Sequence, residues 1–275
     1  MRIRLLSEAD LGFADRVREI AGWNQLPGDW RRFLDLEPEG CFLAEVDGQP
    51  AGTATVTCYG TDLAWIGMVL VHPDFRRRGV GTALLEHAIQ YLREDRGIRS
   101  VKLDATPEGQ PLYEKLGFRA EWGLRRWRSE SRPGGQAAAL APVDLSGASL
   151  ALDHEVFGAD RSPLLRSLAA EGLGGELGAD GGFALMRDGA RALYLGPAVA
   201  RDEASGAAMM EALIRRAPSD RWIFWDIPDG NAAAVSLAGR LGFEPVRVLT
   251  RMWLGGNDTP GDPSRVWALA DPAFG

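Results

Sequence analysis

The sequence predicts an α/β protein built from two related halves. Apolar segments with the two-residue period of strands alternate with segments that have the 3.6-residue period of helices. Similar pieces of sequence recur in the same order on either side of a stretch that contains Pro and Gly. The chain of 275 residues is long enough for two domains of ordinary size.

The boundary between the halves is predicted from one segment. Residues Ser131–Ala139 contain Pro133-Gly134-Gly135 and have little apolar periodicity, which is typical of a linker. We therefore expect one domain over residues 1–130, a linker over 131–141 and a second domain over 142–275.

Turn signals and periodicity place the elements of the first half. Asp47-Gly48 separates two apolar segments and predicts a hairpin. The nearly continuous apolar run from Ala64 to Val71 predicts a buried central strand. The expected strands cover residues 2–6, 42–46, 51–59, 64–71, 101–103 and 118–128, and the expected helices cover 10–22, 27–36, 81–95 and 111–116.

The second half repeats the later part of this pattern. Three pairs of segments match in the same order, at offsets of 125 or 129 residues: Leu112–Phe118 with Leu237–Phe243, Leu124–Trp127 with Leu249–Met252, and Ile66–Val69 with Leu195–Ala198. Three ordered matches indicate an internal duplication. Strands are expected at 191–199, 221–227 and 243–254, helices at 203–216 and 231–241, and a further helix start at Ser162-Pro163.

Composition argues against several classes of protein. The formal net charge of −7 disfavours nucleic acid as the main partner, because phosphate binding requires a basic surface. No apolar run approaches the roughly 20 residues that span a bilayer, and charge follows Met1 too soon for a signal peptide. We therefore expect no membrane partner. Cys41 and Cys58, with three histidines, do not suggest a zinc site, so we also expect no metal and a reduced, cytoplasmic protein.

Residues 68–85 carry the clearest functional signal. An apolar strand runs into a short loop with Gly79 and Gly81, and a helix begins at once. Glycines allow the backbone to approach a ligand, and the first turn of a helix leaves N–H groups that bind anions such as a pyrophosphate. The three arginines at 76–78 add positive charge. A plain strand-to-helix turn with solvated arginines is the alternative, but the order of these features favours an anion site.

The pattern Arg76-x-x-Gly79-x-Gly81 after an apolar strand resembles the acyl-CoA-binding motif of the GNAT acetyltransferase superfamily. Leu112–Phe118 resembles the second motif of that superfamily. The resemblance covers residues 1–130, and the second half is similar to a diverged GNAT domain, as in bacterial tandem-GNAT proteins. It implies two domains, each with a central mixed β-sheet flanked by helices. It also implies transfer of an acetyl group from acetyl-CoA to a primary amine of a small molecule or peptide.

The resemblance further implies which residues bind the cofactor. Backbone groups of one strand are expected to pair with the pantetheine arm where two parallel strands splay apart, and N–H groups of the following loop are expected to hold the pyrophosphate. The expected set is Val69, Leu70, Val71, Arg76, Arg77, Arg78, Gly79, Val80, Gly81 and Thr82. One departure is that Asp104–Gly109 contains no Asn, where many members have one that binds the CoA arm.

The resemblance places a tyrosine that many members use as general acid at Tyr113, although a packed helix aromatic is the alternative. Asp104 is the favoured general base because it ends a strand of the expected cleft, and a solvated or capping carboxylate is the alternative. The other residues considered for the base are Asp29, Glu45, Asp62 and His72. Trp23, Asn24 and Trp30 are expected to line the acceptor site, or else to anchor two helices to the sheet.

The second half is not expected to hold a second active site. Asp202 and Glu203 stand near the place of the phosphates, and Ala238 replaces the tyrosine. Asn231 leaves weak ligand binding open. We expect this half to close the acceptor cleft or to extend the first sheet, in a monomer or a homodimer. A non-catalytic acyl-CoA sensor is the competing function, whereas a nucleotide-binding module is disfavoured because Leu84 replaces the third glycine of its pattern.

Overall fold

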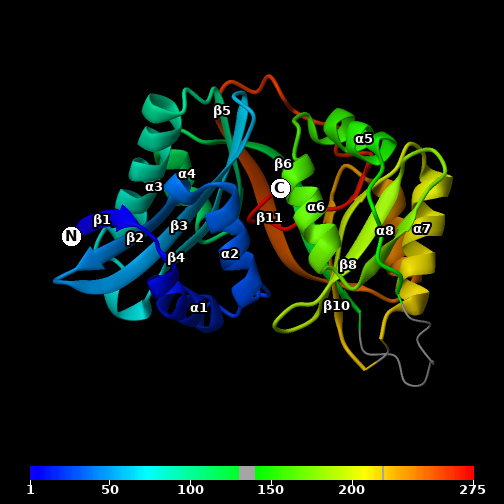
Figure 1. Ribbon diagram of the computed structural model, residues 1–275, viewed down its shortest axis with the longest axis horizontal. Helices are drawn as coiled ribbons and strands as arrows, with labels where there is room; N and C mark the ends of the chain where they lie inside the picture. Colours follow the sequence, from blue (N-terminus) through cyan, green and yellow to red (C-terminus); the bar gives the residue numbers. More distant parts are fainter. Residues whose placement is uncertain (130–139, 219) are drawn as a thin grey trace.

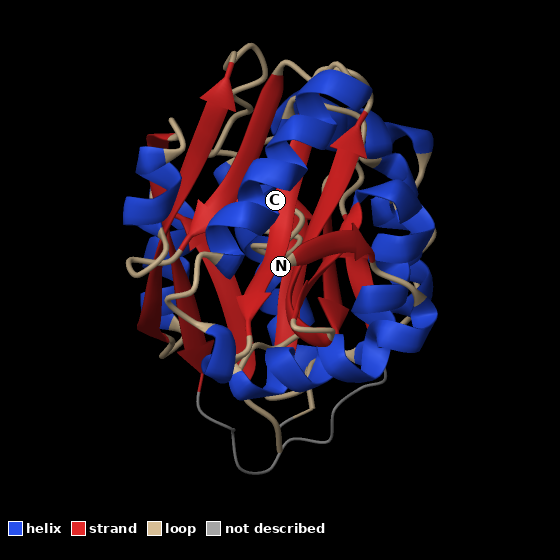
Figure 2. Cartoon of the chain, turned by 90° about the vertical axis from the view of Figure 1, so that its left-hand side faces the viewer, coloured by secondary structure: helices blue, strands red, loops and turns tan. Residues whose placement is uncertain are grey.

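The computed structural model describes residues 1–129, 140–218 and 220–275. It is a mixed α/β structure in which the strands form one sheet with helices packed on it (Figures 1 and 2). This arrangement confirms the expected fold class. Most of the predicted linker lies outside the described residues, so the domain limits stay a prediction.

The first half contains the predicted strands and helices, with one change. The helix expected at 81–95 is divided into an α-helix and a π-helical turn at Tyr91–Asp95. The elements are β1 (Arg2–Leu5), α1 (Leu11–Ile20), α2 (Pro27–Leu36), β2 (Cys41–Val46), β3 (Gln49–Tyr59), β4 (Leu63–Val71), α3 (Val80–Gln90), β5 (Ser100–Ala105), α4 (Gln110–Lys115) and β6 (Arg119–Ser129).

The second half contains the predicted elements and four that the sequence did not predict. The missed strands β7 and β8 are short and lie among glycines, which weaken the strand pattern. The elements are α5 (Gly147–Phe157), α6 (Ser162–Glu171), β7 (Gly174–Leu177), β8 (Phe183–Arg187), β9 (Leu193–Val199), α7 (Glu203–Arg216), β10 (Ile223–Pro228), α8 (Ala232–Arg240), β11 (Glu244–Gly255) and β12 (Val266–Ala268).

The two halves exchange strands in the middle of the sheet. The strand order is β1-β2-β3-β4-β5-β11-β6-β10-β9-β8-β7, with β12 beside β9. Strand β11 of the second half lies between β5 and β6 of the first, and β6 pairs with β10 of the second (Figure 1). The second half therefore extends the sheet of the first.

Two buried ion pairs cross the exchanged strands. Arg126 on β6 donates two hydrogen bonds, of 2.8 and 2.6 Å, to Asp226 on β10. Arg251 on β11 donates two more, of 2.9 and 3.0 Å, to Asp104 on β5. Both carboxylates have no exposed side-chain surface. Because an unpaired charge at such a place is strongly destabilising, each pair favours this order and register of strands.

A common hydrophobic core joins the halves on one face of the sheet. Trp30 and Phe33 of α2 belong to the same buried cluster as Leu165 and Leu168 of α6. At its edge Arg32 donates a hydrogen bond of 2.9 Å to Ser167 and forms an ion pair with Glu171. The α1–α2 and α5–α6 helices thus cover one continuous apolar layer.

The last ten residues pass across both halves. Strand β12 pairs with β9, and the chain then turns towards the first half, so that its end lies in the middle of the molecule (Figure 1). Tyr59 donates its hydroxyl to the carbonyl of Phe274 at 2.7 Å, and Trp65 donates its Nε1 to that of Pro272 at 3.0 Å. The ring of Phe274 stacks on Phe33 at 4.2 Å between centroids. We call residues 266–275 the C-terminal strap.

Replacing Phe274 with alanine tests whether the strap holds the halves together. The side chain is fully buried, so Phe274→Ala should lower the free energy of unfolding by about 3–5 kcal/mol. Denaturant unfolding, followed by tryptophan fluorescence and by circular dichroism, measures the change. Leu177→Ala, at an exposed position, is the control and should change stability by less than about 0.5 kcal/mol. A loss in Phe274→Ala as small as in this control would contradict the assignment.

Candidate active site

The site begins where two parallel strands separate. Strands β4 and β5 pair only over Leu63–Trp65 of β4. From residue 66 to Val71, β4 has no partner on that side among the described strands. Met68 has a positive φ of 48° next to an irregularity in the β3–β4 register. Because such a bulge bends a strand, it helps β4 to turn away from β5 and opens a gap between them.

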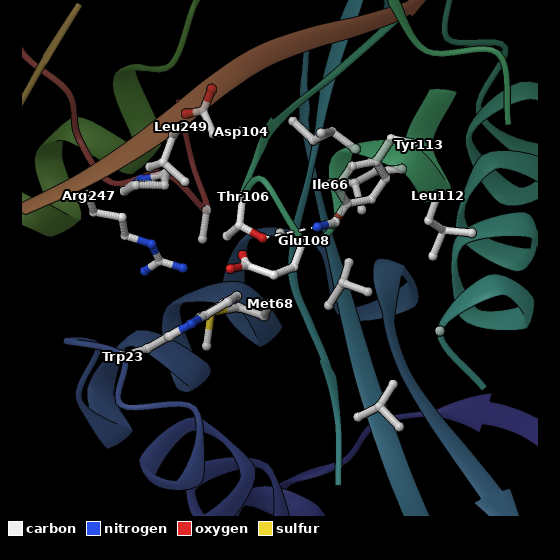
Figure 3. A pocket seen from close by; sticks show the side chains of 18 of the residues that line it. Trp23, Ile66, Met68, Asp104, Thr106, Glu108, Leu112, Tyr113, Arg247 and Leu249 are labelled. Atoms are coloured by element: carbon white, nitrogen blue, oxygen red, sulfur yellow. Dashed lines mark hydrogen bonds between the residues drawn. The ribbon is translucent and has the colours of Figure 1, made fainter. Parts of the chain in front are cut away.

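A cavity of about 380 Å³ fills this gap, within the range of small-molecule sites. It extends from Arg76 and Gly81 past the separated strands to Tyr113, Glu108 and Trp23. Its far end is formed by residues of the second half and of the exchanged strands (Figure 3). The residues that line it are Trp23, Gln25, Ile66, Gly67, Met68, Val69, Val71, Arg76, Gly81, Leu103, Asp104, Thr106, Glu108, Gly109, Leu112, Tyr113, Arg126, Arg247, Leu249, Pro272 and Ala273.

The loop after β4 presents an open helix start to one end of the cavity. Gly79 precedes α3 with a φ of 78°, and no side chain caps the helix. The first-turn N–H groups are therefore available to an anion. All three arginines are exposed, and Arg76 bends back to donate to the Val71 carbonyl at 3.2 Å. The residues fit a pyrophosphate on backbone donors surrounded by arginines.

Models of known protein families match both halves of the chain. The model described as "Acetyltransferase (GNAT) family" matches residues 12–118, and the one described as "Acetyltransferase (GNAT) domain" matches residues 149–268. The chain belongs to the GNAT acetyltransferases. It is a tandem GNAT protein, with one such domain in each half.

Similar proteins extend over most of this tandem GNAT chain. A holothin acyltransferase of Pseudoalteromonas sp. (strain SANK 73390) is 25% identical, over 92% of this chain and 87% of the relative. A [ribosomal protein bS18]-alanine N-acetyltransferase of Salmonella typhimurium is 31% identical, over 52% of this chain and 97% of the relative. The tandem GNAT protein is thus an acyl-CoA-dependent N-acetyltransferase.

Solved structures share the fold of the whole chain. A putative acetyltransferase from Pyrococcus horikoshii has a TM-score of 0.82 and 24% identity, over 100% of this chain and 95% of the other. A tandem GNAT protein from the clavulanic acid biosynthesis pathway has a TM-score of 0.64 and 16% identity, over 92% and 98%. At these identities the likeness concerns the arrangement of the two domains.

Tyr113 lies on the wall of the cavity, on α4 (Figure 3). Its ring packs edge-on to Phe118 and so close to Gly109 that a Cβ there would lie 3.0 Å from the ring. Within the described residues its hydroxyl makes no hydrogen bond, and burial raises the pKa of Tyr113 to about 12. The hydroxyl is therefore a protonated donor at neutral pH without a partner in the described part of the chain.

Asp104 lies beside the cavity, but its carboxylate is occupied. Both oxygens accept hydrogen bonds from Arg251, and the side chain has no exposed surface. Burial raises the pKa of Asp104, while the neighbouring Arg251 guanidinium lowers it. A base needs a carboxylate that can reach the acceptor's proton. The geometry thus argues against Asp104 as the general base and gives it a structural role.

The three residues expected at the acceptor site are separated by the fold. Trp23 lines the cavity. Asn24 is buried between the halves, where its Oδ1 accepts from the backbone N–H groups of Arg191 and Ala192 at 2.9 and 3.0 Å. Trp30 is 1% exposed, in the common core. Asn24 and Trp30 were wrong as acceptor-lining residues, because the second half covers the face of the segment from which they project.

The remaining base candidates lie outside the cavity wall. Asp29 accepts from the Leu26 backbone N–H at 2.7 Å and pairs with Arg32, and Glu45 pairs with Arg4. Asp62 pairs with Arg99, and His72 accepts a long hydrogen bond from the Asp74 backbone. Capping and pairing therefore account for the three carboxylates.

Several cavity residues were not predicted. Glu108 follows β5 in a turn, and its carboxylate points into the cavity, opposite Arg247 and Trp23 (Figure 3). Arg247 and Leu249 come from β11, and Pro272 and Ala273 from the C-terminal strap. No motif marks them, and the strand exchange and the C-terminal strap bring the second half to this site. The second half thus forms part of the cavity wall.

The corresponding gap in the second half is filled by the protein. Strands β9 and β10 pair only over Leu193–Leu195 of β9, and β12 then pairs with β9 beyond that point. The side chain of Asp202 caps α7 by accepting from the Ser205 N–H at 2.8 Å. Asn231 accepts from the Ala234 N–H and donates to the Val266 carbonyl, so its side-chain amide is engaged within the protein.

Two kinds of feature are absent from the described residues. None of their helices is both long and apolar enough to cross a membrane. They also contain no group of three or more His, Cys, Asp or Glu side chains placed to hold a metal ion.

Replacing Gly79 with glutamate tests the anion loop. The side chain would project a negative charge at the open helix start, so CoA affinity should fall by roughly 100-fold or more. A Cβ at Gly79 meets nothing within 4 Å, so the substitution costs only the backbone strain of a side chain at a φ of 78°, roughly 1–2 kcal/mol, and the fold should survive. The matched control is Gly242→Glu, where φ is also 78° and the space is also open. Titration calorimetry with CoA decides: equal affinities of the two folded variants would contradict the assignment.

Proposed function

We propose that this enzyme transfers the acetyl group of acetyl-CoA to a primary amine of a small molecule or peptide. One observation carries the proposal: a single cavity joins the open start of α3 to a free tyrosine hydroxyl and a free carboxylate. The first is suited to a pyrophosphate, the second to a leaving thiolate and the third to an amine proton. The two named relatives acylate holothin and a ribosomal-protein alanine, which is consistent with either kind of amine.

The cofactor-binding residues would act mainly through their backbones. First-turn N–H groups of α3 would hold the pyrophosphate, with Arg76 and Arg77 beside it. The unpaired edge of Val69–Val71 would bind the pantetheine amides as a neighbouring strand would. Bound acetyl-CoA supplies the activated acyl group. The slot between β4 and β5 would shield the bound acyl group from water, and Tyr113 lines the same cavity.

Glu108 would serve as the general base. Asp104 and Glu108 are the two carboxylates that line the cavity, and Arg251 occupies the first. The Glu108 side chain is exposed to the cavity and bends towards its centre (Figure 3). It would take a proton from the acceptor ammonium, directly or through one water, and so provide the neutral amine that attacks.

Tyr113 would stabilise the departing thiolate by hydrogen bonding. A thiol comparable to cysteine has a pKa of about 8.5, well below that of Tyr113, which burial raises to about 12. Full proton transfer from the tyrosine to the thiolate would be uphill. A hydrogen bond in a half-buried site remains favourable, and it strengthens as charge develops on sulfur.

We also place the enzyme in the cytoplasm, because Cys41 and Cys58 are both free thiols. The competing sensor function is less well supported, since a sensor needs neither the Glu108 carboxylate nor a cavity that continues past Tyr113.

Measuring release of free CoA thiol tests the proposal. The panel consists of amines, amino acids, aminoglycosides and peptide N-termini, each with acetyl-CoA. In the wild type at least one class should give saturable turnover. Tyr113→Phe should lower kcat by about 100-fold, with CoA affinity nearly unchanged, because the contact belongs to the transition state. Turnover should not fall between pH 8 and 10 through loss of the Tyr113 proton, since its pKa is about 12. Unchanged kcat in Tyr113→Phe would leave the residue a packing role.

Replacing the two cavity carboxylates one at a time distinguishes a general-base role from a structural role. Glu108→Gln should lower kcat/KM by about 100-fold or more below the pKa of the acceptor amine, and less at high pH where free amine is abundant. Its thermal stability should stay close to the wild type. Asp104→Asn should instead lower the free energy of unfolding by about 3–5 kcal/mol, because it leaves Arg251 unpaired. Losses of activity without destabilisation in Asp104→Asn would return the base role to Asp104.

A further inference from the structure

Arg247 is a charged side chain at the acceptor end of the cavity without a charged partner. It is half-buried on β11, and among the described residues its guanidinium forms no hydrogen bond and no ion pair. The guanidinium lies over the ring of Trp23, with its carbon 5.9 Å from the ring centre. A planar donor group held over an aromatic ring keeps its N–H groups free at its edge.

The position of Arg247 is unfavourable for the folded protein alone. Its Cα is the cross-strand partner of Arg126, and like charges directly opposite each other are destabilising. Burial, and next the charge of Arg126, lower the pKa of Arg247. A register shift between Pro245 and Arg247 marks a bulge at this point of β11, and bulges often re-aim a side chain next to a functional site.

Two oppositely charged side chains at this end of the cavity have no ion-pair partner among the described residues, because the other charged side chains there form ion pairs of their own. Arg126 is neutralised by Asp226, and Asp104 by Arg251. Arg247 and Glu108 remain, and they face each other across the cavity without forming an ion pair within 4.0 Å (Figure 3). A ligand with one positive and one negative group would satisfy both.

We propose that the acceptor is an amine that also carries a carboxylate, as an amino acid does, and that Arg247 binds that carboxylate. This inference rests on the proposed acetyl transfer and names its acceptor class. Arg247 would bind the carboxylate through its N–H edge, while the ammonium lies towards Glu108, which takes its proton. Trp23 would fix the plane of the guanidinium and border the side chain of the acceptor.

The test compares acceptors that differ only in the carboxylate. The pairs are alanine with ethylamine, leucine with 3-methylbutylamine, and phenylalanine with phenethylamine, each in the wild type and in Arg247→Gln. Arg247→Gln should raise KM for an amino acid roughly 10- to 100-fold, the usual worth of a hydrogen-bonded charge, with kcat nearly unchanged. For the decarboxylated amine the two enzymes should be equal, and Arg247→Lys should restore part of the affinity.

Arg119→Gln is the matched control. Arg119 also lies over a tryptophan, Trp253, at 5.4 Å and on the same β6–β11 ladder, but outside the cavity. Its replacement should leave both classes of acceptor and CoA affinity unchanged. Equal losses for amino acids and decarboxylated amines in Arg247→Gln, or a wild type that does not prefer amino acids, would overturn the proposal.

A binding measurement separates this inference from the proposed function. Calorimetry with N-acetylphenylalanine and N-acetylphenethylamine, in the presence of CoA, requires no turnover. Tighter binding of the carboxylate compound by the wild type, and its loss in Arg247→Gln, supports the subsite. If no amine is acetylated at the same time, the proposed acetyl transfer to amines is rejected and the subsite is not. Equal binding of the two compounds rejects the subsite even if some other amine is a substrate.

Discussion

The insertion of β11 between β5 and β6 is the constraint on which the rest of this enzyme depends. It makes one sheet of two domains, and it brings the second half to the gap between β4 and β5. The Arg251–Asp104 pair spans the new strand boundary and is fully buried. Because a buried charge without its partner is strongly destabilising, this pair favours β11 over solvent or another strand as the neighbour of β5.

The same pair decides how the site can work. In an isolated first domain, Asp104 would end a strand at the edge of the cleft and be available to an acceptor. With β11 in place its two oxygens are bound, and Glu108 remains as the free carboxylate of the cavity. Because the Arg251–Asp104 ion pair occupies the first carboxylate, the proposed base is Glu108, which follows it in the chain.

The two copies of the domain share a strand arrangement but differ in what occupies the gap between the strands. In each, a pair of parallel strands separates after three paired residues and is followed by a helix. The first copy keeps an uncapped helix start and an open gap. In the second, Asp202 caps the helix and β12 lies in the gap, with Trp267 packed so tightly on Gly206 that no Cβ fits there. The strand and the tryptophan that fill the gap add buried contacts at this place.

Local signals predicted the fold and the cofactor loop, because both depend on residues close in sequence. The apolar run of β4, the glycines before α3 and the position of Tyr113 belong to one continuous stretch of domain. The misjudged positions depend on contacts distant in the chain. Asn24 and Trp30 lie under the second half, and Asp104 meets a residue 147 positions later. Arg247 lies in the copy without a cofactor loop, and no pattern connects it to Trp23. The offset of 125 residues aligns β6 with β11, but it does not reveal that the two strands lie side by side.

In this arrangement the residues proposed to bind the cofactor and most of those proposed to bind the acceptor lie in different halves. The proposed cofactor site is formed mainly by backbone groups of the first half. The proposed acceptor end is lined by Trp23 of the first half and by Arg247, Leu249 and the C-terminal strap of the second half. A change at Arg247 alters the charge offered to the acceptor without touching the loop before α3 or the ion pair at Asp104. In the proposed reaction, the second half therefore sets the charge that the acceptor meets, while the first half holds the cofactor independently of it.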